Sequence, residues 1–557
     1  MASRPLALAL CLGWLCGCFG QASTANLSEP QRPNFLIIVA DDLGFSDLGF
    51  MGSEIATPAL DRLAREGMVM TDFHVSPACS PTRAMLLTGL DAHRVGYGTM
   101  WDEAAPEQLG QPGYEGVLSA DTPTIAERLS AYGYRTYLSG KWHLGSAPAQ
   151  WPTERGFDHA YGPLAGGASH FADQLPLFFP GQEVPDKAAF IDDGALLTDL
   201  PDDFFSSKNF TDRLIALLEQ DRSSDQPFMA FAMFTAPHWP LQVPDEWRAR
   251  YRGAYDAGWD QLRTSRAAAV KEQGLLSAQG PIPERLPWVD PWHTLTAAQQ
   301  TRAARTMELY AAMVSNLDYH IGRLLDYLDQ SGLADNTYVV FFSDNGAEGN
   351  PVARIVSDHE WVERRFDNRL ENMGRAGSYL YQGPGWAQAS SAPLGWFKTF
   401  PGQGGIQTPA LVRGPGIKAG MITHSLTHVL DIAPTVLELA QAPSAATPLL
   451  AGTSLVPLWR GQRTTVRDAD AVLAWELFGR RALRQGRWKI LWLYEPYGPG
   501  RWQLFDLRED PGETRDLATQ HPQRMAQLIA AWEDYAREQQ VILPAKDASY
   551  ALEPDWR

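Results

Sequence analysis

One cysteine in this chain is placed where its sulfur could do chemistry. Cys79 opens the run Cys79-Ser80-Pro81-Thr82-Arg83, in which Pro81 suits the first turn of a helix. Arg83 comes round to roughly the side of Cys79 and brings a permanent positive charge near it. A helix start also favours an anion, because its first N–H groups have no partner within the helix. These residues predict a sulfur at an anion-binding helix start, and a buried, inert cysteine is an equally good interpretation of them.

Cys79 is also unusual in the context of the whole chain. The other cysteines, at positions 11, 16 and 18, lie in an N-terminal stretch that is typical of an export signal. This stretch has a charged start at Arg4 and an apolar core from Leu6 to Trp14, which is too short to span a bilayer. After cleavage no disulfide within the chain is possible. A lone exported thiol calls for a reason, and conversion to a group other than a thiol would be one.

The export signal has two candidate cleavage points. One follows Ala22 and gives a signal peptide of residues 1–22. The other lies before Cys18, in a sequence similar to a bacterial lipobox, and would leave Cys18 carrying a lipid. We therefore expect an exported protein, periplasmic or secreted, whose only attachment to a membrane would be a lipid anchor at Cys18.

Two apolar runs of the chain end in side chains that carry oxygen. The first leads to Asp41 and Asp42, and the second leads to Asp344 and Asn345. Continuous apolar runs of this length are typical of parallel strands covered on both faces, whose carboxyl ends meet at one edge of a sheet. Three carboxylates and an amide suit Ca²⁺ or Mg²⁺ rather than zinc, and carboxylates this close would repel one another without a cation. The alternative is an aspartate turn that caps the next helix.

Basic side chains occupy three further positions of interest. Lys141 and His143 are two residues apart, so an extended segment would point them in the same direction. His238 follows the buried-strand run 228–234, and Lys398 precedes the pair Gly404-Gly405. Each of these residues alone could equally belong to a solvated or proline-rich loop. The net charge of −18 argues against nucleic-acid binding, and it means that a site for an anion must concentrate positive charge locally.

Together these stretches resemble the motifs of type I sulfatases, in the order in which that family has them. The matching residues are Cys79-Ser80-Pro81-Thr82-Arg83 with Thr88-Gly89, Gly140-Lys141-Trp142-His143-Leu144-Gly145, His238, and the two acidic strand ends. The resemblance covers Pro33 to about Glu538. Within the family, the detailed sequence is most similar to bacterial arylsulfatases of the Pseudomonas kind. One departure is Gln407, which stands where the family has an arginine in Gly-Gly-x-Arg-x-Pro.

The resemblance implies an alkaline-phosphatase-like α/β fold. Its central, mostly parallel sheet would be flanked by helices and would form a catalytic domain of residues 33–455. A smaller C-terminal domain, residues 456–557, would hold an antiparallel sheet and a helix. The alternating pattern of Trp475 to Tyr494 independently favours hairpin strands there. Residues 246–305 are predicted to be irregular.

The resemblance also implies the chemistry of the site. The cysteine of the motif is converted in sulfatases to formylglycine, an aldehyde, and a single calcium ion is bound nearby. The implied calcium ligands are Asp41, Asp42, Asp344, Asn345 and residue 79. The implied catalytic residues are Cys79, Arg83, Lys141, His143, His238, Asp344 and Lys398, of which Lys141, His238 and Lys398 also bind substrate.

Each catalytic residue has an implied role. Asp344 would accept a proton from the hydrated aldehyde as it attacks sulfur. His238, helped by Lys398, would protonate the departing alcohol or phenol, and His143 would later take a proton so that sulfate is expelled. Arg83 and the two lysines would gather positive charge around the anionic ester.

We therefore predict a sulfuric ester hydrolase of the arylsulfatase type. Its partners would be a small sulfate ester and a maturation enzyme that generates formylglycine, with no nucleic acid. One alternative is a phosphonate or phosphate-diester hydrolase of the same superfamily. Another is a non-catalytic carbohydrate-binding homologue, which would apply if Cys79 stayed unmodified. A zinc phosphomonoesterase would need clustered histidine ligands, which this sequence lacks.

Overall fold

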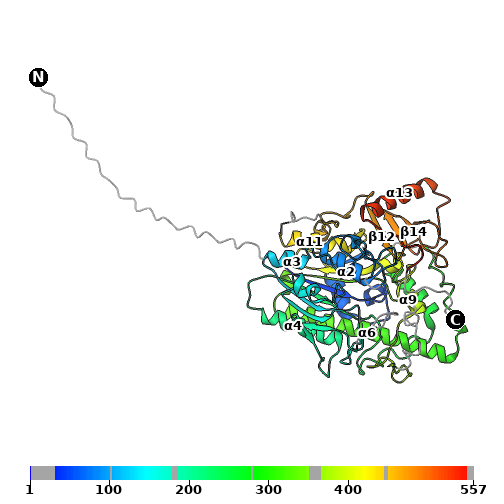
Figure 1. Cartoon of the computed structure of the whole chain (residues 1–557), viewed down its shortest axis with the longest axis horizontal. Coiled ribbons are helices and arrows are strands. Elements are labelled where there is room, and N and C mark those ends of the chain that lie inside the picture. Colours follow the sequence, from blue (N-terminus) through cyan, green and yellow to red (C-terminus); the bar gives the residue numbers. More distant parts are fainter. Residues whose placement is uncertain are drawn as a thin grey trace. The chain divides into compact units, whose positions relative to one another are not determined.

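The computed structural model describes Met1 and residues 32–100, 103–177, 186–276, 280–350, 365–443 and 450–548. The export signal, both candidate cleavage points and Cys18 lie outside these residues, so export and lipidation stay predictions. From Arg32 onward the described residues form two β-sheets with helices packed against them (Figure 1).

The larger sheet has 11 strands among the described residues. Its order is β10-β2-β9-β8-β1-β7-β3-β4-β5-β6, with β11 beside β2. The strands are β1 (Asn34–Ala40), β2 (Met68–His74), β3 (Arg135–Gly140), β4 (His159–Pro163), β5 (Phe190–Asp192), β6 (Ala195–Leu197), β7 (Phe228–Met233), β8 (Thr337–Ser343), β9 (Gln407–Arg413), β10 (Met421–Thr423) and β11 (Thr427–His428). The strands β8, β1, β7 and β3 run parallel in the middle of the sheet, whereas β9, β5 and β6 pair antiparallel.

The helices cover both faces of this sheet. They are α1 (Pro58–Glu66), α2 (Cys79–Thr88), α3 (Ile125–Ala131), α4 (Ser206–Gln220), α5 (Gly258–Glu272), α6 (Ala297–Gln330), α9 (Pro384–Ser390), α10 (Gln403–Ile406), α11 (Ile432–Leu439) and α12 (Val456–Trp459). Figure 1 shows α2, α3 and α11 on one side of the sheet and α4 and α6 on the other. The prediction that residues 246–305 are irregular is wrong for α5 and for the first turns of α6.

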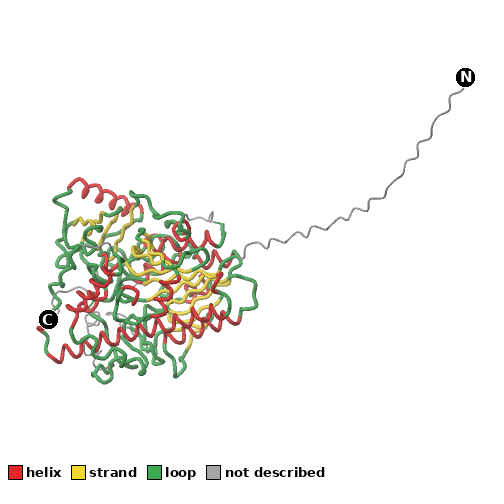
Figure 2. Tube along the Cα trace, turned by 180° about the vertical axis from the view of Figure 1, so that it is seen from behind, coloured by secondary structure: helices red, strands yellow, loops and turns green. Residues whose placement is uncertain are grey.

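The side-chain alternation of β1 explains the two layers. Phe35, Ile37 and Val39 point into the core beneath α2, α3, α11 and α12. Leu36 and Ile38 point into the core beneath α1, α4 and α6. Every residue of β1 is buried, as expected for a parallel strand with helices on both faces. In Figure 2 the long helix α6 runs below the strands of this sheet.

The smaller sheet is antiparallel, in the order β12-β13-β14-β15. Its strands are β12 (Val472–Leu477), β13 (Arg480–Gln485), β14 (Trp488–Trp492) and β15 (Gln503–Asp506), and the helix α13 (Pro522–Glu538) packs on one face. The other face packs against aromatic side chains of the preceding segment, including Phe397 and Phe400. The predicted fold class, an α/β domain with a C-terminal antiparallel sheet and helix, is confirmed, whereas the boundary at residue 455 stays a proposal.

Buried polar contacts join the two sheets. Arg484 of β13 makes two contacts of 2.7 Å to the carboxylate of Asp72 in β2. Further along the contact, His93 lies between two carboxylates, 2.9 Å from Asp91 Oδ1 and 3.0 Å from Glu476 Oε2. These hydrogen bonds and charges outweigh the effect of burial and raise the pKa of His93 to about 10. A protonated His93 therefore links the segment after α2 to strand β12.

We expect His93→Gln to lower the free energy of unfolding by about 3 kcal/mol at pH 6, because it breaks a buried ion pair. The folded-state pKa of His93 lies above its unfolded value of 6.5. Its stabilising contribution is therefore complete below about pH 6.5 and is lost as the pH rises through about 10. Urea unfolding at pH 6 and pH 10 should show the difference between wild type and variant shrinking. His159→Gln is the control, because His159 forms a partly exposed pair with Asp193 and should cost less than about 1 kcal/mol. A difference that grows with pH would contradict the assignment.

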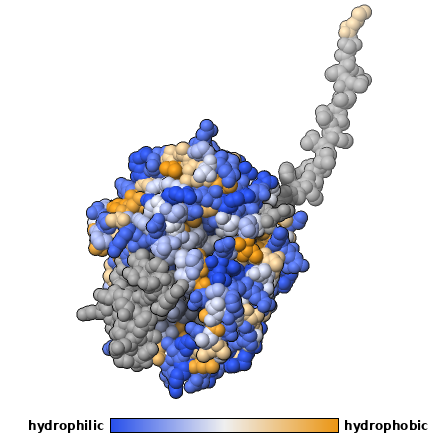
Figure 3. All heavy atoms as spheres, turned by 90° about the vertical axis from the view of Figure 1, so that its right-hand side faces the viewer, coloured by the Kyte–Doolittle hydropathy of each residue, from blue (hydrophilic) through white to orange (hydrophobic). Residues whose placement is uncertain are grey.

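The surface carries isolated apolar side chains rather than a large patch in the view of Figure 3, which is mostly hydrophilic. Among the described residues, no helix combines the length and apolar character that crossing a membrane would require.

Candidate active site

The predicted site residues meet at the carboxyl ends of four neighbouring parallel strands. In the register of β1 and β8, Ala40 pairs with Ser343, so Asp41 and Asp344 follow side by side. Strand β7 leads towards His238, and β3 leads directly into Lys141 and His143. The sheet order thus brings together side chains as far apart in the chain as Asp42 and Asn345, which are separated by 303 residues, at the edge where open α/β sheets bind ligands.

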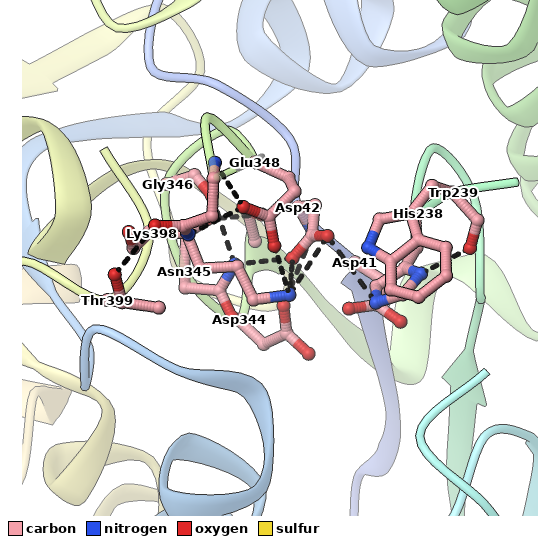
Figure 4. A network of polar contacts seen from close by, with 12 residues as sticks. Asp41, Asp42, His238, Trp239, Asp344, Asn345, Gly346, Glu348, Lys398 and Thr399 are labelled. Atoms are coloured by element: carbon pink, nitrogen blue, oxygen red, sulfur yellow. Dashed lines mark hydrogen bonds and ion pairs between the residues drawn. The ribbon is translucent and has the colours of Figure 1, made fainter. Parts of the chain in front are cut away.

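Each acidic side chain in the site lies against a cation. Lys141 Nζ is 2.7 Å from Asp41 Oδ2, and Lys398 Nζ is 2.7 Å from Asp42 Oδ1. Arg83 donates through Nε to Asp344 Oδ2 at 2.9 Å, and its Nη1 donates to the backbone carbonyl of Lys141 at 2.9 Å. All of these side chains are almost completely buried. Figure 4 shows Asp42, just after β1, in contact with Lys398, Asn345 and His238.

Three residues in or next to the site have a strained backbone conformation. Asp42, His143 and Thr399 all have positive φ angles, of 66°, 62° and 73°. Non-glycine residues rarely adopt this conformation, which costs free energy and persists where the surrounding structure enforces it. Asp42 and His143 belong to the site and Thr399 directly follows Lys398, so the fold holds functional segments in backbone conformations that an isolated chain would avoid.

Cys79 is the first residue of α2, as the sequence predicts. All ten residues of this helix are buried. The sulfur and one carboxylate oxygen each of Asp41 and Asp344 lie within 4.8 Å of one another. Burial raises the pKa of the Cys79 thiol, against the opposing effect of Lys141 and Lys398. The side chain at position 79 therefore lies among the carboxylates and close to the basic residues.

The oxygen atoms of the site fit a hard cation. Asp41 Oδ1 and Asn345 Oδ1 are buried and accept no hydrogen bond from any described residue. Asn345 uses its nitrogen instead, donating to Asp42 Oδ1 at 2.7 Å, which leaves its oxygen facing away from that bond. Burial, together with the neighbouring carboxylates, raises the pKa of both Asp41 and Asp344. A divalent cation would bind the two oxygens that accept no hydrogen bond, and it would reduce the repulsion between the neighbouring carboxylates.

Two neutral histidines lie at the site. Burial, Lys398 and Lys141 lower the pKa of His238 well below its usual value, and burial with Lys141 does the same for His143. His238 Nδ1 lies 2.5 Å from the backbone carbonyl of Trp239, so it carries the proton, and Nε2 lies 3.5 Å from Asp42 Oδ2. Neutral imidazole suits the acceptance of a proton by His143. His238 must first gain a proton before it can donate one to the leaving group. An anionic group bound beside the two lysines would favour this protonated form.

All the predicted site residues are therefore brought together: Asp41, Asp42, Cys79, Arg83, Lys141, His143, His238, Asp344, Asn345 and Lys398. Gln407 lies elsewhere, in the contact between the two sheets, where it hydrogen-bonds Gln403 and the backbone of Thr71. One further residue at the site, Glu348, is not predicted from the sequence, and its buried carboxylate lies 3.3 Å from Lys398 Nζ. Its position four residues after Asp344 is the only signal that could have suggested it.

The fold and the site define a hydrolase of anionic esters, with basic side chains around a residue at a helix start and carboxylates suited to a divalent cation. The family described as Sulfatase matches residues 33–442. A second family, described as N-sulphoglucosamine sulphohydrolase, C-terminal, matches residues 393–540. The chain belongs to the sulfatase family, whose members hydrolyse sulfate esters and generally use formylglycine and a divalent metal.

Relatives that match most of the chain agree with this assignment. The chain is 41% identical over 541 residues to an uncharacterised sulfatase of Schizosaccharomyces pombe, a match that covers 93% of this chain and 96% of the relative. It is 40% identical over 421 residues to an arylsulfatase of Klebsiella aerogenes, covering 75% of this chain and 89% of the relative.

Solved structures share the fold. One of Ps i-CgsB in complex with k-i-k-neocarrahexaose has a TM-score of 0.66 at 23% identity, covering 94% of this chain and 95% of the other. One of the PsFucS1 sulfatase from Pseudoalteromonas sp. has a TM-score of 0.62 at 19% identity, covering 91% of each chain.

Proposed function

We propose that this sulfatase acts as an arylsulfatase-like hydrolase of small sulfate monoesters, with formylglycine at position 79 and one bound calcium ion. The observation that carries the proposal is the meeting of Cys79, the acidic strand ends and the basic residues at one edge of the sheet. The similarity to the Klebsiella aerogenes arylsulfatase supports the substrate class.

The proposed metal ligands are Asp41, Asp42, Asp344 and Asn345, together with residue 79. The two oxygens that accept no hydrogen bond from described residues, on Asp41 and Asn345, support this set. Calcium is proposed over magnesium because the five ligands come from three separate segments of the chain, and calcium accepts a larger and less regular set of oxygens. When bound, the ion would add positive charge next to the sulfate group.

The formylglycine hydrate would supply the oxygen that attacks sulfur. Asp344, held by Arg83, is placed within reach of residue 79 to accept a proton. Lys141 and Lys398 would bind the sulfate oxygens and stabilise the charge that develops on them. His238 would protonate the leaving oxygen with the help of Lys398, and His143 would accept the proton whose removal lets sulfate depart.

The proposal includes the maturation and export of the protein. A maturation enzyme that oxidises a cysteine in the Cys-x-Pro-x-Arg context would have to act on Cys79 before α2 is buried, because Cys79 is only 1% exposed in the folded structure. Export, with cleavage after Ala22 or lipidation at Cys18, remains part of the proposal, as does the division at residue 455.

The two histidines test the assigned roles. We expect His238→Ala to reduce turnover of alkyl sulfates by roughly 10²- to 10⁴-fold and to affect nitrophenyl sulfate much less. A nitrophenolate leaves almost unaided, whereas an alkoxide depends on a proton from a general acid. Turnover of a series of sulfate esters with different leaving groups measures this dependence.

His143→Ala is expected to behave differently. Its step follows departure of the alcohol, so nitrophenyl sulfate should give an initial burst of phenol and then a slow phase limited by sulfate release. His159→Ala, at a partly exposed ion pair, is the control and should resemble wild type. Equal losses along the series for His238→Ala, with no burst for His143→Ala, would mean that the roles are assigned to the wrong histidines.

A further inference from the structure

A fourth buried carboxylate lies at the edge of the site, outside the mechanism described above. Glu348 is 3% exposed and lies in the loop that follows β8. Its Oε1 accepts two hydrogen bonds from Asn350, from the backbone nitrogen at 2.7 Å and from the side-chain nitrogen at 2.6 Å. Its Oε2 lies 3.3 Å from Lys398 Nζ. The two bonds from Asn350 fix the carboxylate with one oxygen aimed at the lysine.

The Lys398 ammonium is consequently held from two sides. Asp42 contacts it with both carboxylate oxygens, at 2.7 and 3.0 Å, and Glu348 contacts it through Oε2 (Figure 4). Lysine has a flexible four-carbon side chain with a point charge at its end, so two anchors restrict it far more than one. Of these anchors, Asp42 is a proposed metal ligand, which leaves Glu348 as the carboxylate available to orient the lysine.

The backbone around Lys398 is tied to the same loop. Lys398 donates its backbone N–H to Ala347 at 3.0 Å, and Asn350 Nδ2 donates to the Lys398 carbonyl at 3.3 Å. Thr399 donates its hydroxyl to Asn350 Oδ1 at 3.2 Å and accepts from Arg480 of β13 at 2.9 Å. The loop after β8, the Lys398 segment and the C-terminal sheet therefore form one hydrogen-bonded unit. Such support matters because a misplacement of about 1 Å at a reacting group can cost on the order of 10²-fold in rate.

We propose that Glu348 is a positioning residue that aligns Lys398 with the leaving group and whose negative charge favours singly charged substrates. This inference rests on the proposed sulfatase function. A sulfate monoester carries one negative charge, whereas a phosphate monoester carries two at pH 8, above its second pKa of about 6. A fixed carboxylate in a buried site repels the second charge more than it repels the first alone. Glu348 thus opposes phosphate monoesters while it orders the lysine that sulfate esters use.

Two substitutions separate the effect of the negative charge of Glu348 from the effect of its side-chain length. Glu348→Gln keeps the shape and removes the charge. It should lower the ratio of kcat/KM for nitrophenyl sulfate to kcat/KM for nitrophenyl phosphate by roughly tenfold at pH 8. Glu348→Asp keeps the charge and withdraws it by one methylene, so this ratio should stay near the wild-type value. Both variants should lose about 10- to 100-fold more activity on alkyl sulfates than on nitrophenyl sulfate, because Lys398 is no longer aligned.

Glu513→Gln is the matched control. Glu513 is also a buried carboxylate, 2.7 Å from Lys489, but it lies in the contact with the C-terminal sheet. It should change neither the sulfate-to-phosphate ratio nor the dependence on leaving group. The proposal is overturned if Glu348→Gln leaves both quantities unchanged, or if Glu513→Gln changes them equally. It is also overturned if Glu348→Gln loses its calcium, since Glu348 would then be a metal ligand. A wild-type protein that cleaves no sulfate ester would instead refute the proposed function itself.

Discussion

Replacing Cys79 by alanine is expected to reduce sulfate ester hydrolysis by roughly 10⁴-fold or more, since it removes the group from which the nucleophile is made. Cys79→Ser should lose nearly as much. A serine hydroxyl would not be converted to the aldehyde, and a sulfated serine could not expel sulfate in the way that an aldehyde hydrate can. Initial rates on nitrophenyl sulfate, normalised to folded protein, measure the loss.

Ser80→Ala is the control for Cys79. Ser80 is the next residue of α2, and its buried hydroxyl makes no hydrogen bond to any described residue, so its removal should leave both stability and rate near wild type. Substantial turnover by Cys79→Ala would refute the assignment of the nucleophile. Equal losses in Cys79→Ala and Ser80→Ala would show that the helix start, rather than the cysteine, had been damaged.

Asp344→Asn is expected to lose both the bound calcium and at least about 10³-fold in turnover, because this carboxylate is proposed as ligand and as base. The substitution also leaves Arg83 without its charged partner, which lies 2.8 Å away. Elemental analysis of the purified protein, combined with rates measured at saturating calcium, separates loss of the ion from loss of the base.

Asp318 offers a matched control for Asp344. It is a buried aspartate of α6 that accepts hydrogen bonds from the backbone N–H groups of Ala59 and Leu60, at the start of α1. Burial raises its pKa to about 7. In Asp318→Asn the amide NH2 would face one of the two backbone N–H donors, so the substitution should cost stability, but the folded variant should keep both calcium and activity. Stoichiometric calcium in Asp344→Asn, or stoichiometric zinc without calcium in the wild type, would contradict the proposed metal site.

The parts of the site that the sequence predicts correctly are those with a local signature. An apolar run followed by acidic residues is enough to place Asp41 and Asp344 at strand ends, because burial on both faces demands such runs in a parallel sheet. The register of β1 and β8 then brings the two carboxylates together. Cys79 at the start of α2 is equally local, since Pro81 and Arg83 lie within one helical turn of it.

The parts that the sequence could not predict depend on contacts between distant segments. Glu348 matters only because Lys398, fifty residues later, folds back against it. The helix α5 was missed because its residues lack a clear apolar stripe and it is buried at only a few positions, among them Arg266 and Val270. Arg266 reaches the buried carboxylate of Asp47, a partner more than 200 residues away, and that partner cannot be read from a short window of sequence.

Mass spectrometry of the peptide that contains residue 79 tests the central claim most directly. In active protein purified from a host that carries the maturation enzyme, we predict an aldehyde or its hydrate at this position, and a reagent that captures aldehydes should label it and inhibit turnover in proportion. A fully active protein in which residue 79 is an intact, alkylatable thiol would contradict the account.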